Sequence, residues 1–142
     1  MRAVFTLLFF AVMGHVCAQD GRLYKGAINK KMNVVFYLEG LDEGTYADPI
    51  VGSYRYDNQK NYILLNGYRN NAGNISLVEQ STANFSGTFL GRIIKNKIIG
   101  SWISADGKSS YTFELTEIVP AGPQVEKFKN AIKEKADEFR AY

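Results

Sequence analysis

The sequence predicts an all-β protein: an eight-stranded antiparallel up-and-down β-barrel followed by a C-terminal amphipathic α-helix. Between residues 22 and 118, short runs rich in Tyr, Phe, Ile, Val and Thr alternate with turn residues, as in antiparallel sheets. Most connections between these runs have hairpin length, so consecutive strands should pair. Glycines recur beside large aromatic residues in run after run, which favours a sheet that coils tightly enough to close.

Eight runs have the composition and alternation of strands. They are residues 22–28, 33–39, 50–56, 61–68, 74–80, 85–94, 97–104 and 109–118. The pattern is clearest between residues 85 and 117, where tight turns at Lys95-Asn96 and 105–108 separate three strands. A two-sheet sandwich is the alternative arrangement, and the repeated glycines favour the barrel. An eight-stranded barrel has an interior that side chains fill or that holds one small ligand.

The glycine–aromatic motifs carry a resemblance to a known group of proteins. Gly52-Ser-Tyr-Arg-Tyr56, Gly87-Thr-Phe89 and Gly100-Ser-Trp102 resemble motifs of small secreted bacterial meander barrels of uncharacterised function. The architecture that this resemblance implies is similar to that of avidin and lipocalin barrels, and it covers residues 22–118. Beyond the one Gly-x-Trp motif, Gly100-Ser-Trp102, the chain has no motif that matches avidin, so no biotin contact carries over. The resemblance therefore implies a fold and no particular ligand.

The N-terminal residues have the features of a secretory signal peptide. Arg2 supplies a positive charge, residues 4–13 are apolar, and Val16-Cys17-Ala18 forms a small-residue cleavage pattern. We expect cleavage after Ala18 and a secreted or periplasmic protein, with lipid attachment at Cys17 as the less favoured alternative. The apolar run is too short to span a bilayer, so a transmembrane protein is not expected. The predicted organisation is a signal peptide (1–18), a barrel domain (19–119), and a linker with the helix (120–142).

Cleavage would remove the only histidine and the only cysteine, His15 and Cys17. A mature chain without imidazole or thiol cannot use Ser-His-Asp or Cys-His catalysis, and it lacks the ligands of zinc and haem sites. Glu79 and Glu117 then remain as the acid/base option, although strand-end carboxylates are usually solvated. We expect no catalytic residues, no metal, no cofactor and no enzymatic activity.

The charge of the chain gives no sign of a nucleic-acid partner. Loss of Arg2 with the signal peptide lowers the formal net charge from +3 to +2. The Lys and Arg residues are spread evenly, whereas phosphate binding requires a basic patch or stripe.

The C-terminal residues change in character. Residues 120–123 contain two prolines and a glycine, and Pro123 suits the first turn of a helix. One helical stripe then carries the apolar side chains Val125, Phe128, Ile132, Ala136 and Phe139. This stripe needs a surface to cover it. The favoured surface is the chain's own barrel, and the alternatives are a partner protein or a membrane.

The aromatic residues predicted to face the interior are the candidate ligand site. They are Tyr54, Tyr56, Phe89, Trp102, Tyr111 and Phe113, with Tyr24 and Phe36 on the same face. These side chains suit a ring-containing ligand, or else they simply fill the barrel. The first functional hypothesis is a non-enzymatic protein that holds a small apolar or aromatic ligand in the barrel. The alternative is a protein–protein interaction module, an envelope scaffold or an inhibitor of a secreted enzyme. Such a module would use the C-terminal helix or the outer barrel face.

Overall fold

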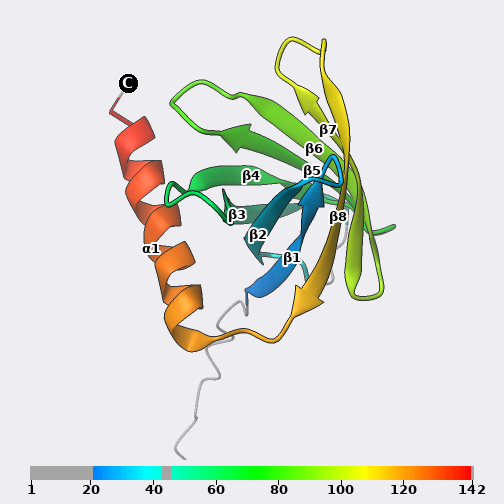
Figure 1. Cartoon of the computed structure of the whole chain (residues 1–142), viewed down its shortest axis with the longest axis horizontal. Helices are drawn as coiled ribbons and strands as arrows, with labels where there is room; N and C mark the ends of the chain where they lie inside the picture. The colour runs from blue at the N-terminus through cyan, green and yellow to red at the C-terminus, as the bar shows by residue number, and fades with distance from the viewer. Residues whose placement is uncertain (1–20, 43–45, 142) are drawn as a thin grey trace, which may run out of the picture.

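The computed structural model describes residues 21–42 and 46–141 and shows a closed antiparallel barrel with one helix (Figure 1). Each of the eight strands pairs with its neighbours in sequence, and β1 pairs with β8 to complete the ring. The predicted fold class is confirmed, and the sandwich alternative is wrong. The predicted signal peptide, residues 1–18, lies outside the described residues.

The strands follow the predicted order with small changes at their ends. Their bounds are β1 Arg22–Ile28, β2 Met32–Glu39, β3 Asp48–Tyr56, β4 Ile63–Arg69, β5 Asn74–Gln80, β6 Gly87–Ile94, β7 Lys97–Ser104 and β8 Ser110–Ile118. β3 begins earlier than predicted because Asp48 pairs with Arg69 of β4. β4 begins later because Tyr62 precedes the ladder and its ring packs edge-on against Phe128, with the centroids 5.1 Å apart.

Glycines allow the neighbouring strands to coil closely around one another. A Cβ atom on Gly67 would lie 1.7 Å from the carbonyl oxygen of Ser76, and one on Gly100 would lie 2.0 Å from that of Leu90. No side chain fits at either position, because the obstacle is the backbone of the next strand. The glycines predicted from the sequence to permit closure therefore stand where two backbones come into contact.

The middle of the barrel is filled by aromatic rings. Phe36 stacks on Tyr54 with a centroid separation of 4.5 Å, and the edge of Phe89 meets Phe36 at 5.2 Å. Phe113 meets Phe89 at the same distance, 5.2 Å. These are ordinary contact distances for packed rings. The rings at this level occupy the interior themselves.

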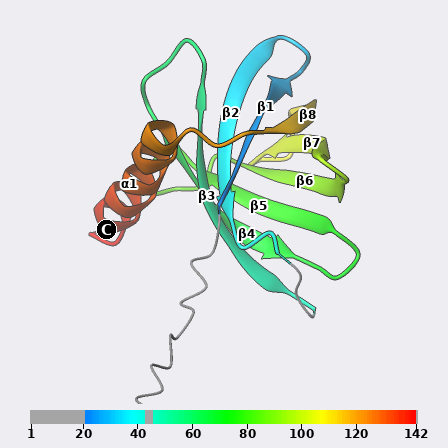
Figure 2. The same cartoon turned by 90° about the horizontal axis from the view of Figure 1, so that it is seen from below.

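The helix α1, Gly122–Phe139, lies against the outside of the barrel (Figure 2). Its Phe128 is buried with Leu23, Val35 and Tyr37, which point outward from β1 and β2. The hydroxyl of Ser53 in β3 donates a hydrogen bond of 3.2 Å to the main-chain oxygen of Phe128. The prediction that the apolar stripe covers the chain's own barrel is confirmed.

The packing of α1 against the outside of the barrel explains why β2 is apolar on both faces. Val34, Phe36 and Leu38 belong to the interior core, while Val35 and Tyr37 are covered by α1. α1 begins as predicted, with Pro123 in its first turn, where a missing N–H costs no hydrogen bond. Within the described residues, no helix combines the length and the apolar character needed to cross a membrane.

Replacement of Phe128 by alanine should detach α1 from the barrel. Because the ring is 0% exposed, Phe128→Ala should lower the free energy of unfolding by about 3–5 kcal/mol. Urea denaturation followed by far-ultraviolet circular dichroism would measure this change. The matched control is Phe139→Ala, since Phe139 is only partly buried near the end of the same helix. Equal losses in the two variants would contradict the proposed role of Phe128.

Candidate functional site

The barrel has two ends, which we call the mouth and the base. Four connections surround the mouth: residues 29–31, 57–62, 81–86 and 105–109 (Figure 1). The base is the opposite end, where β1, β3, β5 and β7 begin and β2, β4, β6 and β8 end. The two ends hold different chemical groups.

A buried carboxylate, Glu79, lies near the mouth at 6% exposure. The Tyr54 hydroxyl and the Trp102 indole N–H both donate to its Oε2, the latter over 3.2 Å. The Ser86 hydroxyl donates to Oε1 over 2.6 Å. Three donors from β3, β7 and the β5–β6 connection therefore converge on one carboxylate, and all three are uncharged.

Gly87 makes room for this arrangement. It is the cross-strand partner of Glu79, and a Cβ atom on it would lie 2.4 Å from the Trp102 Nε1 atom. Without a side chain at this position, the indole lies over β6 and reaches the carboxylate. The motif Gly87-Thr-Phe89, read from the sequence as a sign of coiling, thus also positions Trp102.

The two phenols beside Glu79 remain protonated. Burial raises the pKa of Tyr54 far above its usual range, and the negative charge of Glu79 raises it further. Burial also raises the pKa of Tyr56, whose ring meets that of Tyr54 edge-on at 5.7 Å. Both groups are therefore neutral and can act as hydrogen-bond donors across the physiological pH range.

Trp102 and Tyr111 form an accessible aromatic pair near the mouth. Their rings are almost parallel, at 7°, with centroids 5.6 Å apart. Tyr111 is 37% exposed, and Trp102 is partly buried. In contrast to the rings in the middle of the barrel, this pair presents aromatic surface to the solvent.

The structure divides the predicted ligand residues into two groups. Tyr54, Tyr56 and Trp102 meet around Glu79, and Tyr111 joins them through its stack on Trp102. Phe89 and Phe113 lie deeper and belong to the packed core.

Sequence reasoning assigned Glu79 only to an acid/base pair and missed Ser86. Alternation placed Glu79 on the inward face of its strand. A glycine opposite an inward residue, here Gly87, indicates space for a large side chain nearby. Nothing local in the sequence distinguishes Ser86 from other loop serines.

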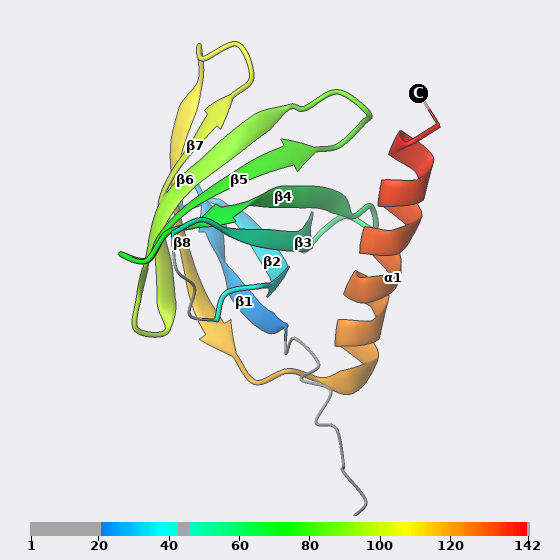
Figure 3. The same cartoon turned by 180° about the vertical axis from the view of Figure 1, so that it is seen from behind.

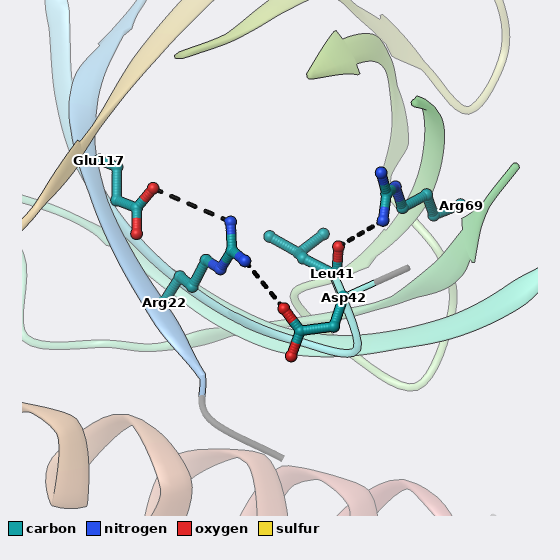
Figure 4. A network of polar contacts seen from close by, with 5 residues as sticks. All are labelled: Arg22, Leu41, Asp42, Arg69 and Glu117. Atoms are coloured by element: carbon teal, nitrogen blue, oxygen red, sulfur yellow. Dashed lines mark hydrogen bonds and ion pairs between the residues drawn. The ribbon is translucent and has the colours of Figure 1, made fainter. Parts of the chain in front are cut away.

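Glu117 lies at the base, at the opposite end of the barrel from Glu79. There, Arg22 is paired with Asp42 at 2.8 Å, and its other nitrogen lies 4.0 Å from the Glu117 carboxylate (Figure 4). The Arg69 guanidinium donates to the main-chain oxygen of Leu41 over 2.6 Å. Because Glu79 and Glu117 occupy different ends, they do not form the carboxylate pair that acid/base catalysis would need.

Leu41 closes the base. Its side chain is buried in the interior core, and the contacts of Asp42 with Arg22 and of its own carbonyl with Arg69 hold the backbone in place. Burial and the nearby Glu117 charge raise the pKa of Tyr24, the innermost phenol at this end. The base is thus a closed, ion-paired end of the barrel.

An open groove of about 1310 Å³ runs along the outer face of β6, β7 and β8. These strands lie on the side of the barrel away from α1 (Figure 3). Leu90 and Ile99 line the groove at 46% and 39% exposure. The charged residues Lys30, Arg92 and Glu114 line it as well. Within the described residues, no helix covers this face.

No family model matches the chain, and no curated protein or solved structure matches it. Across residues 21–42 and 46–141, no group of His, Cys, Asp and Glu side chains is arranged to hold a metal ion. The functional proposal therefore depends on the geometry of the mouth and of the outer groove.

The buried Tyr54 should make stability sensitive to alkaline pH. The pKa of Tyr54 in the folded chain is raised above the ordinary phenol value of 10.0, so this phenol ionises first in the unfolded chain. The free energy of unfolding should therefore fall above about pH 10, by up to about 1.4 kcal/mol per pH unit from Tyr54. Urea denaturation at several alkaline pH values would show this slope.

The variant Tyr54→Phe should have a shallower slope, because it lacks the ionisable group. Tyr68→Phe is the control, since Tyr68 is 59% exposed on the outer face. A Tyr54→Phe slope identical to that of the unmodified protein would show that Tyr54 is not the group responsible.

Proposed function

We propose that this chain is a secreted or periplasmic, non-enzymatic binding protein for a small apolar or aromatic ligand. The ligand lies at the mouth, against Trp102 and Tyr111. The observation that carries this proposal is the parallel, partly exposed aromatic pair held in place by a buried carboxylate. Mouths of β-barrels are common positions for small-molecule sites.

The mouth suits a ligand better than the middle of the barrel does. Phe36, Tyr54, Phe89 and Phe113 are already in mutual contact in the middle, so a ring placed there would have to displace them. Trp102 and Tyr111 have aromatic faces near the solvent, and both side chains combine an apolar body with a polar group. The proposal thus keeps the predicted ligand class and moves its position outward.

The Trp102 side chain is ordered before any ligand arrives. Its N–H is bonded to Glu79, and its ring lies over Gly87. A ring that is already fixed loses little conformational entropy on binding, which increases affinity. This preorganisation is the expected property of a binding platform.

A second candidate function is protein binding through the outer groove. The apolar side chains Leu90 and Ile99 match a partner segment with apolar residues, and the charges of Lys30, Arg92 and Glu114 border them. α1 is a weaker candidate for such a contact because its apolar stripe already covers the barrel. An envelope scaffold or an enzyme inhibitor of this kind would use the face opposite the helix.

Trp102 is the only tryptophan in the chain, so its fluorescence reports directly on the mouth. Titration with benzyl alcohol, a neutral ring-containing probe, should change this fluorescence saturably. Tyr111→Ala removes the stacked ring and should weaken probe binding by about 2- to 10-fold.

The matched control is Tyr68→Ala, which removes an exposed tyrosine from the outer face of β4 and should leave binding unchanged. A fluorescence signal that does not respond to the probe would contradict the proposed site. Unchanged affinity in Tyr111→Ala would do the same.

A further inference from the structure

The carboxylates at the two ends of the barrel have different partners. At the base, Glu117 and Asp42 share Arg22 as a cationic neighbour. At the mouth, Glu79 receives hydrogen bonds from a phenol, an indole and a hydroxyl. Among the residues that the structure describes, no lysine or arginine forms an ion pair with Glu79.

The Glu79 charge is therefore stabilised but not neutralised. Only 6% of this residue is exposed, and removing a carboxylate from water is costly unless an opposite charge accompanies it. Its three donors are uncharged, so none of them supplies the opposite charge. A positively charged group beside this carboxylate would complete the electrostatics of the mouth.

The side chains around Glu79 are also suited to a cation. Trp102 and Tyr111 form aromatic surface beside Glu79 that reaches the solvent, whereas the Tyr54 ring is fully buried against Phe36 and contributes its hydroxyl. The faces of aromatic rings are electron-rich and attract ammonium groups, with tryptophan the strongest. A carboxylate among aromatic faces is a chemical match for an organic cation.

Other charged ligands fit less well. A hard metal ion needs several oxygen ligands, whereas the groups around Glu79 use their N–H and O–H donors on the carboxylate itself. An anion would be repelled by the Glu79 charge. The chemistry of the mouth thus selects a ligand that is both positively charged and apolar.

The geometry points to a ring-bearing organic ammonium ion as the ligand of the mouth, with its nitrogen toward Glu79 and its ring against Trp102 and Tyr111. This inference rests on the proposed function and adds the charge of the ligand to it. The class includes protonated aromatic amines and quaternary ammonium compounds. The ring of the ligand would contact the aromatic side chains predicted from the sequence, Trp102 and Tyr111. The ammonium charge would lie beside the Glu79 carboxylate, which has no cationic partner among the described residues.

The test compares two probes that share a benzyl ring: benzyltrimethylammonium, which is always cationic, and benzyl alcohol, which is neutral. Both are titrated into the full chain at constant ionic strength, with Trp102 fluorescence as the readout. We expect the cation to bind at least about tenfold more tightly than the alcohol. Equal affinity for the two probes would overturn the inference while leaving the aromatic site in place. A chain that responds to neither probe would overturn both proposals.

Two variants separate charge from structure. Glu79→Gln removes the charge and keeps an acceptor for the Trp102 N–H, so it should lower the affinity for benzyltrimethylammonium about tenfold and bring it close to that for benzyl alcohol. The charge-matched control is Glu117→Gln, which removes a carboxylate from the base and should retain the preference for the cation. Loss of the preference in Glu117→Gln, or its persistence in Glu79→Gln, would contradict the assignment to the Glu79 charge. If Glu79→Gln does not fold, the comparison of probes in the unmodified chain and in Glu117→Gln still decides.

Discussion

The close approach of β1 to β8 is the constraint on which the rest of the structure depends. At this seam, a Cβ atom on Gly26 would lie 1.8 Å from the carbonyl oxygen of Glu114. Only glycine permits the two backbones to meet there and complete the ring of hydrogen bonds. Closure leaves no free sheet edge, and it directs one face of every strand into a common interior. The aromatic core and the mouth network both exist because the ring is complete.

The parts of the fold that follow from local patterns were predictable. Alternation along each strand identified the inward side chains, and the hairpin-length connections gave the strand order. The depth of a residue in the barrel does not follow from alternation, because it depends on the stagger between strands after closure. The orientation of a ring does not follow from alternation either. Phe89 and Trp102 are cross-strand partners, yet Phe89 is fully buried, whereas the Trp102 ring lies over Gly87 and bonds Glu79.

The carboxylate network was hidden for the same reason. Tyr54 and Trp102 are 25 and 23 residues from Glu79 along the chain, and only the curvature of the sheet brings them together. The apolar outer face of β2 was visible in the sequence, but its meaning required the helix that covers Val35 and Tyr37. Local sequence thus identified which side chains face inward, while closure and the helix determined what each one contacts.

The difference between the two ends assigns them different tasks. At the base, Leu41 completes the core, and the paired charges of Arg22 and Asp42 close the surface above it. At the mouth, the polar groups converge on Glu79 without a cation, and aromatic surface remains exposed. A ligand that enters at the mouth leaves the hydrophobic core intact, because the rings beneath it already pack against one another. In the proposed binding function, the packed barrel is the rigid support, and the few side chains around Glu79 determine the specificity.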